Sequence, residues 1–328
     1  MDEVTLRGSH YEIGCQIGEQ LRKNRKKLPE LNADQTRYID GLVERAGGLV
    51  PDLLDEMRGI ADSGGYDERA VYFYSLSIGI VPACTVVAVS GKHTEDGRTM
   101  FGRNYDAGPE FADFTLYRTY PDSGFAHIGC AYNLLVGREG GMNEAGLAIA
   151  VTGVQGHNTD EPGLWDHIPV RAVLDQCRTV DEAVTLLEAI PHLWTKNFLV
   201  ADKTGQIAVV EAAQQHVAIS RTTDGFGAIT NHFILPQMEA FCNREKVPSN
   251  SSHRRDAAYR WFEAARDADK PLDRDDLKRL LSATGEGVRS ELHEDFTTVW
   301  SWIARLDERI IDLSDRLPEP DTFRRYEF

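Results

Sequence analysis

Cysteine is scarce in this sequence, and its spacing argues against two common roles. The 328 residues contain five cysteines, none of them in a CxxC pair. They are Cys15, Cys84, Cys130, Cys177 and Cys242. An odd and widely spaced set is not the pattern of a disulfide framework or of a zinc ribbon. We therefore expect neither.

Long apolar segments and an excess of basic residues are also missing. No uninterrupted apolar stretch is long enough to span a bilayer, and the first residues, MDEVTLRGSH, have no basic or apolar signal region. With 36 Lys plus Arg against 52 Asp plus Glu, the net charge is −16. This balance disfavours nucleic acid and anionic membranes as partners. We expect a cytoplasmic protein without either partner, and leave open a homo-oligomer.

Metal-ligand spacing is absent as well. Two groups contain suitable residue types: His157, Asp160 and His167, and His293, Glu294 and Asp295. Neither group has the spacing of a known helix-borne metal site. We expect no metal and no cofactor.

Two familiar nucleophile arrangements are disfavoured too. The sequence has no GxSxG motif, which argues against a Ser-His-Asp hydrolase. A papain-like dyad would pair Cys84 with a histidine such as His93 or His232. The residues that flank Cys84 do not match that family's signature.

The first quarter of the chain, residues 9 to 83, has helical patterns. Ser9 and Glu12 form a capping-box pattern, and Gly14 and Gly18 lie on a face that another element can approach closely. We expect helices over about 9–21, 34–46, 51–63 and 67–79.

From Cys84 onward the pattern changes to short strands. Strands are expected at about 84–90, 99–104, 114–120, 125–132, 146–151, 197–202, 206–211, 216–220 and 226–230, with closing strands at 297–304 and 309–313. Helices are expected near 168–177, 180–190, 252–267 and 272–283. Periodicity alone indicates an α+β fold in which helices cover sheets.

The stretch from Ala83 to Asp106 places chemistry at one end of a sheet. A β-branched run follows Cys84, and Asp96-Gly97 is a strong hairpin signal. The return strand brings Arg103 and Asp106 back beside Cys84. A guanidinium near a thiol favours the nucleophilic thiolate, whereas a buried packing role is the alternative for a free cysteine.

Five blocks in this order resemble the N-terminal-nucleophile (Ntn) cysteine hydrolases, above all the acyl-coenzyme A:6-aminopenicillanate acyltransferase family. Choloylglycine hydrolases and penicillin V acylases are related. The blocks are Gly8-Ser9 with Glu12, Gly14, Gln16 and Gly18; Cys84 with Gly102-Arg103-Asn104-Tyr105-Asp106; Gly141 to Leu147; Asn197 with Ala201 to Gly205 and Glu211; and Thr230-Asn231-His232 followed by Asn250-Ser251 and Arg254.

The resemblance implies the four-layer αββα Ntn-hydrolase sandwich and self-cleavage between Ala83 and Cys84. Cys84 would attack the carbonyl of Ala83, and the resulting ester would hydrolyse. Residues 1–83 would be a helical pro-segment and 84–328 the catalytic chain, together one globular unit. The new α-amino group, with an ordinary pKa of roughly 7.7 to 8.0, would serve as the base.

The resemblance also implies roles for further residues. Asp106 would orient the amine and thiol, and Arg103 would stabilise the thiolate. Asn231 would donate its side-chain N–H to the oxyanion, and Gly153 falls where the family supplies a main-chain N–H. Arg254 is the candidate for the family's late arginine. Arg255 is its neighbour, and the register between them stays open.

The implied activity is hydrolysis of a linear amide, a small molecule, through an acyl-enzyme on Cys84. The alternatives are acyl transfer to an amine and a non-catalytic binding protein on the same scaffold. For Asn143 and Glu144 a tight turn and a catalytic role are both open. Trp165, Trp194 and Phe198 belong either to an aromatic pocket or to the core.

Overall fold

The structure is a computed structural model. It describes residues 1–78, 83–108, 113–131, 136–156, 162–214, 216–285, 287–293 and 296–328, with the backbone alone at 291–293 and 296. His157, Asp160, Glu294 and Asp295 lie outside the described residues.

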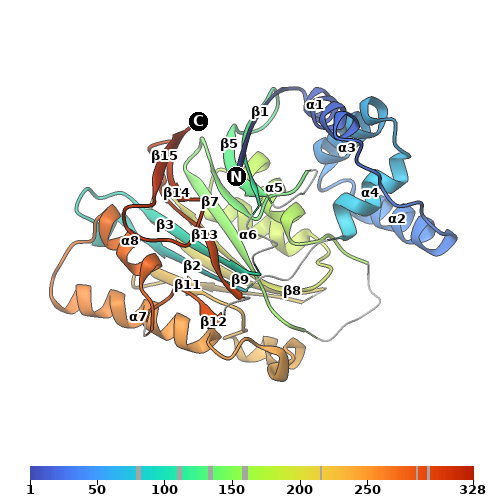
Figure 1. Cartoon of the computed structure of the whole chain (residues 1–328). Coiled ribbons are helices and arrows are strands. Elements are labelled where there is room, and N and C mark those ends of the chain that lie inside the picture. Colours follow the sequence, from blue (N-terminus) through green and yellow to red (C-terminus); the bar gives the residue numbers. More distant parts are fainter. Residues whose placement is uncertain are drawn as a thin grey trace.

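Four helices precede the cysteine strand, as the sequence predicts. They are α1 (His10–Lys23), α2 (Ala33–Ala46), α3 (Pro51–Gly64) and α4 (Glu68–Ser77). The capping box of Ser9 and Glu12 is present at the start of α1. A Cβ added to Gly14 would collide with the backbone of Glu56, so glycine lets α1 and α3 cross closely. Figure 1 shows these helices grouped at one end of the molecule.

A strand that the sequence analysis did not predict precedes the helices. Strand β1 (Asp2–Gly8) pairs in parallel with β4 (Thr115–Pro121), so the N-terminal segment is not purely helical. Along β1 only Leu6 is buried, and this mostly polar pattern gave no strand signal.

The first sheet has eight strands in the order β1-β4-β5-β6-β7-β8-β9-β10. Its later members are β5 (His127–Ala131), β6 (Gly140–Asn143), β7 (Leu147–Gly153), β8 (Thr195–Asp202), β9 (Ile207–Ala213) and β10 (His216–Arg221). Strand β6 was also missed, because its sequence GGMN has little intrinsic strand preference.

The second sheet has the order β11-β2-β3-β13-β14-β15, and β12 pairs with β13. Its strands are β2 (Ala83–Val89), β3 (Met100–Ala107), β11 (Phe226–Ile229), β12 (Glu291–His293), β13 (Phe296–Arg305), β14 (Ile310–Ser314) and β15 (Arg324–Glu327). Of these, β12 and β15 were not predicted.

Helices cover the outer face of each sheet. Helices α5 (His167–Gln176) and α6 (Val180–Ala189) pack on the first sheet. Helices α7 (Ser251–Asp267) and α8 (Arg274–Ser282) pack on the second. Short 3-10 helices lie at Gly91–His93, Pro236–Phe241 and Arg244–Lys246. The result is a mixed α+β protein built on two facing sheets (Figure 1).

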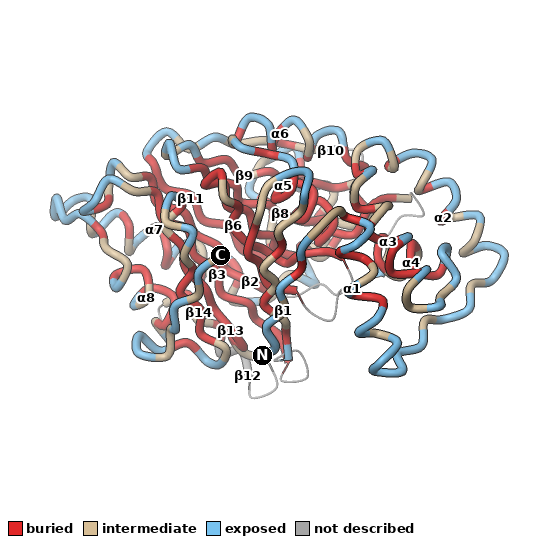
Figure 2. Tube along the Cα trace, turned by 90° about the horizontal axis from the view of Figure 1, so that it is seen from above, coloured by how far each residue is buried: buried red, intermediate tan, exposed pale blue. Residues whose placement is uncertain are grey.

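The inner faces of the two sheets form one core, and Cys84 lies in it. Along β2, Cys84, Val86 and Ala88 point into this core, whereas Val87 and Val89 pack toward α7 and α8. The alternation follows from the two-residue period of a strand. Figure 2 shows the central strands of both sheets buried, while the N-terminal helices expose their outer turns. The fold therefore places the Cys84 thiol between the sheets.

Candidate active site

The β2–β3 hairpin sorts the predicted site residues onto two faces of the second sheet. Cys84 pairs with Tyr105, and Val86 pairs with Arg103, so these side chains share the inner face. Asp106 pairs with Ala83 and falls on the outer face, toward α7 and α8. The hairpin thus brings Arg103 to the thiol and keeps Asp106 on the other side of the strand.

The Cys84 thiol is fully buried and accepts a hydrogen bond from Arg103. The distance from Arg103 Nη2 to Cys84 Sγ is 3.1 Å. Burial raises the pKa of the thiol to about 11, although Arg103 acts in the opposite direction. Of these two effects on the thiol pKa, desolvation is the larger in the intact chain. At neutral pH the thiol therefore needs a base.

The backbone of Cys84 is held from both sides by the side chains of Asn231 and Arg254. The Cys84 N–H donates to Asn231 Oδ1 at 3.0 Å, and the Cys84 carbonyl accepts from Arg254 Nη1 at 2.6 Å. Asn231 follows β11, which pairs with β2, and Arg254 lies in the first turns of α7. Arg254 Nη2 also donates to Asn231 Oδ1 at 2.8 Å.

Asp106 is linked to Cys84 and Asn231 through Arg254. Its Oδ2 lies 3.3 Å from Arg254 Nη1, and its Oδ1 accepts from Thr298 Oγ1 at 2.6 Å. Burial raises the pKa of Asp106, while Arg254 opposes that shift. Arg255 instead places its guanidinium over the ring of Tyr259, 4.5 Å from its centroid. Of the two arginines that the sequence left open, Arg254 is the one beside Cys84.

Gly153 lies next to Asn231, at the end of β7. Its carbonyl accepts a hydrogen bond from Asn231 Nδ2 at 2.8 Å. The next residue, Val154, donates its N–H to Thr195 on the neighbouring strand. Residues alternate in the direction of their backbone groups along an antiparallel ladder, so the N–H and C=O of Gly153 both point away from β8, toward the Asn231 side.

Sequence reasoning missed Glu139. It directly precedes β6, and its carbonyl accepts a hydrogen bond from Arg103 Nη1. Its carboxylate Oε2 lies 3.6 Å from Arg103 Nη2 and is buried. Burial, together with Asp166, raises the pKa of Glu139 to about 8, against the effect of Arg103. The one available signal was its position just before the block Gly141 to Leu147.

Of the two roles left open for Asn143 and Glu144, the contacts of both residues are those of a tight turn. Asn143 Oδ1 accepts from the N–H groups of Ala145 and Leu147, and its Nδ2 donates to two carbonyls at the end of α5. Glu144 binds the Ala126 N–H and pairs with Arg309. These contacts build the β6–β7 turn.

Of the aromatic candidates, Phe198 belongs to the core and the two tryptophans contact each other. Phe198 is fully buried in the core between the first sheet and α5–α6. The rings of Trp165 and Trp194 lie 5.9 Å apart, Trp165 buried and Trp194 partly exposed.

The histidine partners considered for Cys84 lie elsewhere. His93 binds the carbonyl of Asp224, and His232 Nδ1 contacts Ser251 Oγ at 2.8 Å. Across the described ranges, no three ligand-type side chains gather as a metal site. In the same ranges no helix is both long and apolar enough to cross a bilayer.

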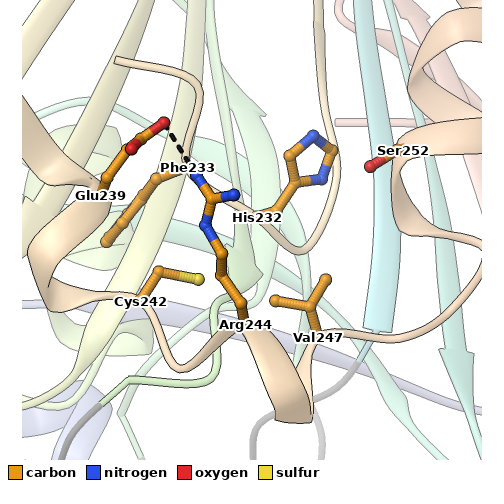
Figure 3. Close-up of a pocket in the computed structure, with 7 residues that line it drawn as sticks. All are labelled: His232, Phe233, Glu239, Cys242, Arg244, Val247 and Ser252. Atoms are coloured by element: carbon orange, nitrogen blue, oxygen red, sulfur yellow. Dashed lines mark ion pairs between the residues drawn. The ribbon is translucent and has the colours of Figure 1, made fainter. Parts of the chain in front are cut away.

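A cavity of about 280 Å³ lies beside His232, the residue that follows Asn231 in the chain. It is lined by His232, Phe233, Glu239, Cys242, Arg244, Val247 and Ser252 (Figure 3). Burial lowers the pKa of His232 to about 4, so its ring is neutral near pH 7. Arg244 pairs with Glu239 across the cavity at 2.8 Å.

Comparison with solved structures shows where this fold occurs. A mutant of the conjugated bile acid hydrolase from Clostridium perfringens matches with a TM-score of 0.55 and 16% identity, over 75% of this chain and 92% of that one. The N-acylethanolamine-hydrolyzing acid amidase ortholog of Caenorhabditis elegans matches with a TM-score of 0.52 and 18% identity, over 75% of this chain and 100% of that one. The chain therefore shares the fold of these two proteins.

Comparison of the sequence with other proteins finds one relative and one matching family. An uncharacterized protein of Archaeoglobus fulgidus is 25% identical over 71% of this chain, and the match spans 50% of that protein's length. The profile of the acyl-coenzyme A:6-aminopenicillanic acid acyl-transferase family matches residues 93–303, well over half of the chain. The chain therefore belongs to the acyl-coenzyme A:6-aminopenicillanic acid acyl-transferase family.

Proposed function

We propose that the protein is a self-processing cysteine amidohydrolase that cleaves linear amides through an acyl-thioester on Cys84. The observation that carries the proposal is that three buried side chains all contact Cys84. Arg103 contacts its thiol, Asn231 accepts its N–H and Arg254 binds its carbonyl, all of them buried. A packing cysteine needs none of these contacts.

The first step of the proposal is cleavage of the peptide bond between Ala83 and Cys84. Sγ bonds to the Ala83 carbonyl carbon, the C–N bond breaks, and the thiol proton ends on the Cys84 nitrogen. Water then hydrolyses the thioester, which releases the Ala83 carboxylate and restores the thiol. The products are a pro-segment of residues 1–83 and a catalytic chain of residues 84–328, which form one globular unit.

Cleavage supplies the base that the buried thiol lacks. The new α-amino group has an ordinary pKa of roughly 7.7 to 8.0 and can accept the thiol proton near neutral pH. Asn231 Oδ1, which accepts the Cys84 N–H in the intact chain, is placed to orient this amine. Arg254, which pairs with Asp106, holds the side chain of Asn231 in position.

Asn231 and Gly153 are the proposed oxyanion donors. Asn231 Nδ2 donates to the Gly153 carbonyl, so the two residues lie side by side. The Gly153 N–H is oriented to the same side as that carbonyl. One such donor contributes roughly 3 to 4 kcal/mol in the transition state.

The substrate class follows by analogy with the structural neighbours, whose names describe hydrolysis of conjugated bile acids and of N-acylethanolamines. We propose a small linear amide for this chain.

Acyl transfer to an amine is the second candidate, because the matching family is described as an acyl-transferase. Both routes share the acyl-thioester and differ only in whether water or an amine attacks it. A non-catalytic binding protein is the third, but Cys84, Asp106 and Asn231 are all retained.

The test is to trap the acyl-enzyme. The protein is mixed with a short-chain acyl p-nitroanilide, quenched in acid, digested and analysed by mass spectrometry. We expect the acyl mass on the peptide that begins with Cys84, no label in Cys84→Ser, and normal labelling in Cys130→Ala. Turnover that continues in Cys84→Ser would overturn the proposal.

Added primary amines then separate the two routes. Hydrolysis predicts free acid as the main acyl product at millimolar amine. Saturating diversion to a new amide identifies a transferase.

A further inference from the structure

The guanidinium of Arg103 has two buried acceptors besides the Glu139 backbone. Its Nη2 lies 3.1 Å from Cys84 Sγ and 3.6 Å from Glu139 Oε2. Its Nη1 donates to the Glu139 carbonyl, which fixes the orientation of the group. One nitrogen of one cation is therefore shared between the thiol and a carboxyl group.

Polar atoms around this shared nitrogen lack hydrogen bonds. Glu139 Oε2, Arg103 Nε and the Tyr105 hydroxyl are all buried without a hydrogen-bond partner in the described part of the chain. Buried polar atoms are normally paired, and leaving them unpaired costs free energy. A purely structural ion pair would bring the carboxyl oxygen closer to Arg103 and satisfy these atoms.

The charges facing Glu139 come from several elements. Cys84 lies on β2, Arg103 and Tyr105 on β3, Cys130 on β5, and Asp166 just before α5. Beyond them, the buried Lys196 of β8 interacts with Asp166.

Burial and the Asp166 charge favour the neutral carboxyl, whereas Arg103 favours the ionised one. The charge on Glu139 therefore changes near neutral pH, beside the nucleophile.

We propose that Glu139 is a positioning residue that holds Arg103 on the nucleophile and competes with the Cys84 thiolate for its charge. The proposal rests on the proposed role of Cys84. When Glu139 is protonated, the full guanidinium charge acts on Sγ. When Glu139 is ionised, that charge is divided, and a thiolate must form beside a carboxylate. Glu139 thus limits the reactivity of Cys84 as pH rises.

The experiment is a titration of Cys84 that needs no substrate. Protein labelled with carbon-13 at the cysteine Cβ is followed by NMR between pH 6 and 10, and the Cys84 signal is assigned by its absence in Cys84→Ser. Denaturing mass spectrometry of the same sample records whether the chain is intact or cleaved. Failure of the proposed amidase activity would leave this readout unaffected.

Glu139→Gln keeps the shape and removes the charge. We expect it to lower the pH at which Cys84 ionises by about one unit, a tenfold rise in thiolate at fixed pH. Glu139→Asp keeps the charge but shortens the reach, and should give a clearly smaller shift. Glu211→Gln removes a buried carboxylate that instead binds the Ile234 and Leu235 N–H groups, and should leave Cys84 unchanged.

An unchanged or raised Cys84 titration in Glu139→Gln would overturn the proposal. Equal shifts in Glu139→Gln and Glu139→Asp, or a comparable shift in Glu211→Gln, would also overturn it, because they would indicate a general change in packing or charge. If Glu139→Gln does not fold, the Cys84 titration of Glu139→Asp is compared with that of Glu211→Gln. A larger downward shift in Glu139→Asp supports the proposal, and equal shifts overturn it.

Discussion

Two buried clusters of charge in this molecule are built on opposite principles. The Arg171 cluster joins His10 and Glu56 of the N-terminal helices to His127, Arg171 and Asp175 of the sheet and α5. The Cys84 cluster joins Cys84, Arg103, Asp106, Glu139, Asn231 and Arg254. Arg171 binds Glu56 at 2.8 Å and Asp175 at 2.9 Å, and the carboxylate oxygens of both are paired. In the Cys84 cluster, Asp106 Oδ2 and Glu139 Oε2 form no hydrogen bond with any residue that the structure describes, although each lies near an arginine.

The pKa shifts of the carboxyl groups follow this difference. Burial raises the pKa of Glu56 and of Asp175, but Arg171 and the neighbouring histidines together outweigh it, so the pKa of each is lowered. Burial outweighs the arginines in the Cys84 cluster and raises the pKa of Asp106 and of Glu139. Carboxylates paired at both oxygens are typical of a structural joint, whereas incompletely paired carboxyl groups with raised pKa values cluster at functional sites. This difference supports the proposal of a catalytic role for the Cys84 cluster and favours a structural role for the Arg171 cluster.

The largest expected effect is on stability. Arg171→Met leaves Glu56 and Asp175 buried without their cation, and should lower the free energy of unfolding by about 3 to 5 kcal/mol. Arg103→Met is equally buried, but Glu139 can stay protonated at pH 7, so we expect a clearly smaller loss. Urea unfolding of both variants at pH 7 measures the difference. Equal losses would remove the distinction between the clusters.

The next effect is on rate. Asn231→Ala should lower amide hydrolysis by about 10²- to 10³-fold, because one oxyanion donor is lost. Transfer to an amine should fall by the same factor, since both routes form the same oxyanion. Steady-state rates with and without amine test this. A variant that loses only one activity would mean that Asn231 binds a substrate group instead.

Local signals explain which parts of this architecture were predictable. The capping box at Ser9 and the Asp96-Gly97 turn act within a few residues, and α1 and the β2–β3 hairpin followed from them. Strands β1 and β6 depend on partners distant in sequence, β4 for the first and β5 and β7 for the second. Their polar or glycine-rich sequences carry no strand pattern of their own.

The same limit applies to the site. Arg103 could be placed beside Cys84 because both lie on one hairpin, whereas Asn231 and Arg254 came from family resemblance alone. Glu139, just before β6, meets Arg103 only because the first sheet packs over the second. Nothing local to Glu139 predicts that contact.

A third effect concerns pH and stability. The pKa of Glu139 is raised, so between about pH 4.5 and 8 the unfolded chain has lost a proton that the folded chain keeps. Stability should therefore fall as pH rises through this window, by at most about 1.4 kcal/mol per pH unit. The pKa of Glu56 is lowered, so its contribution is complete above about pH 5 and is lost only in acid.

Urea unfolding at pH 5 and pH 7.5 measures this slope. Glu139→Gln should flatten it relative to the parent, and Glu211→Gln is the matched control. A slope that is unchanged in Glu139→Gln would contradict a neutral Glu139 in the folded protein.

The central claim, that Cys84 cuts its own chain and then serves as the nucleophile, is tested most directly by denaturing mass spectrometry of the purified protein. Cys130 is the matched control, because it is equally buried and also interacts with Arg103 but lies on β5, away from Ala83. The account predicts two chains that separate between Ala83 and Cys84 in the parent and in Cys130→Ala, and one intact chain in Cys84→Ala. An intact parent chain that still hydrolyses amides, or a Cys84→Ala variant that is still cut before residue 84, would contradict it.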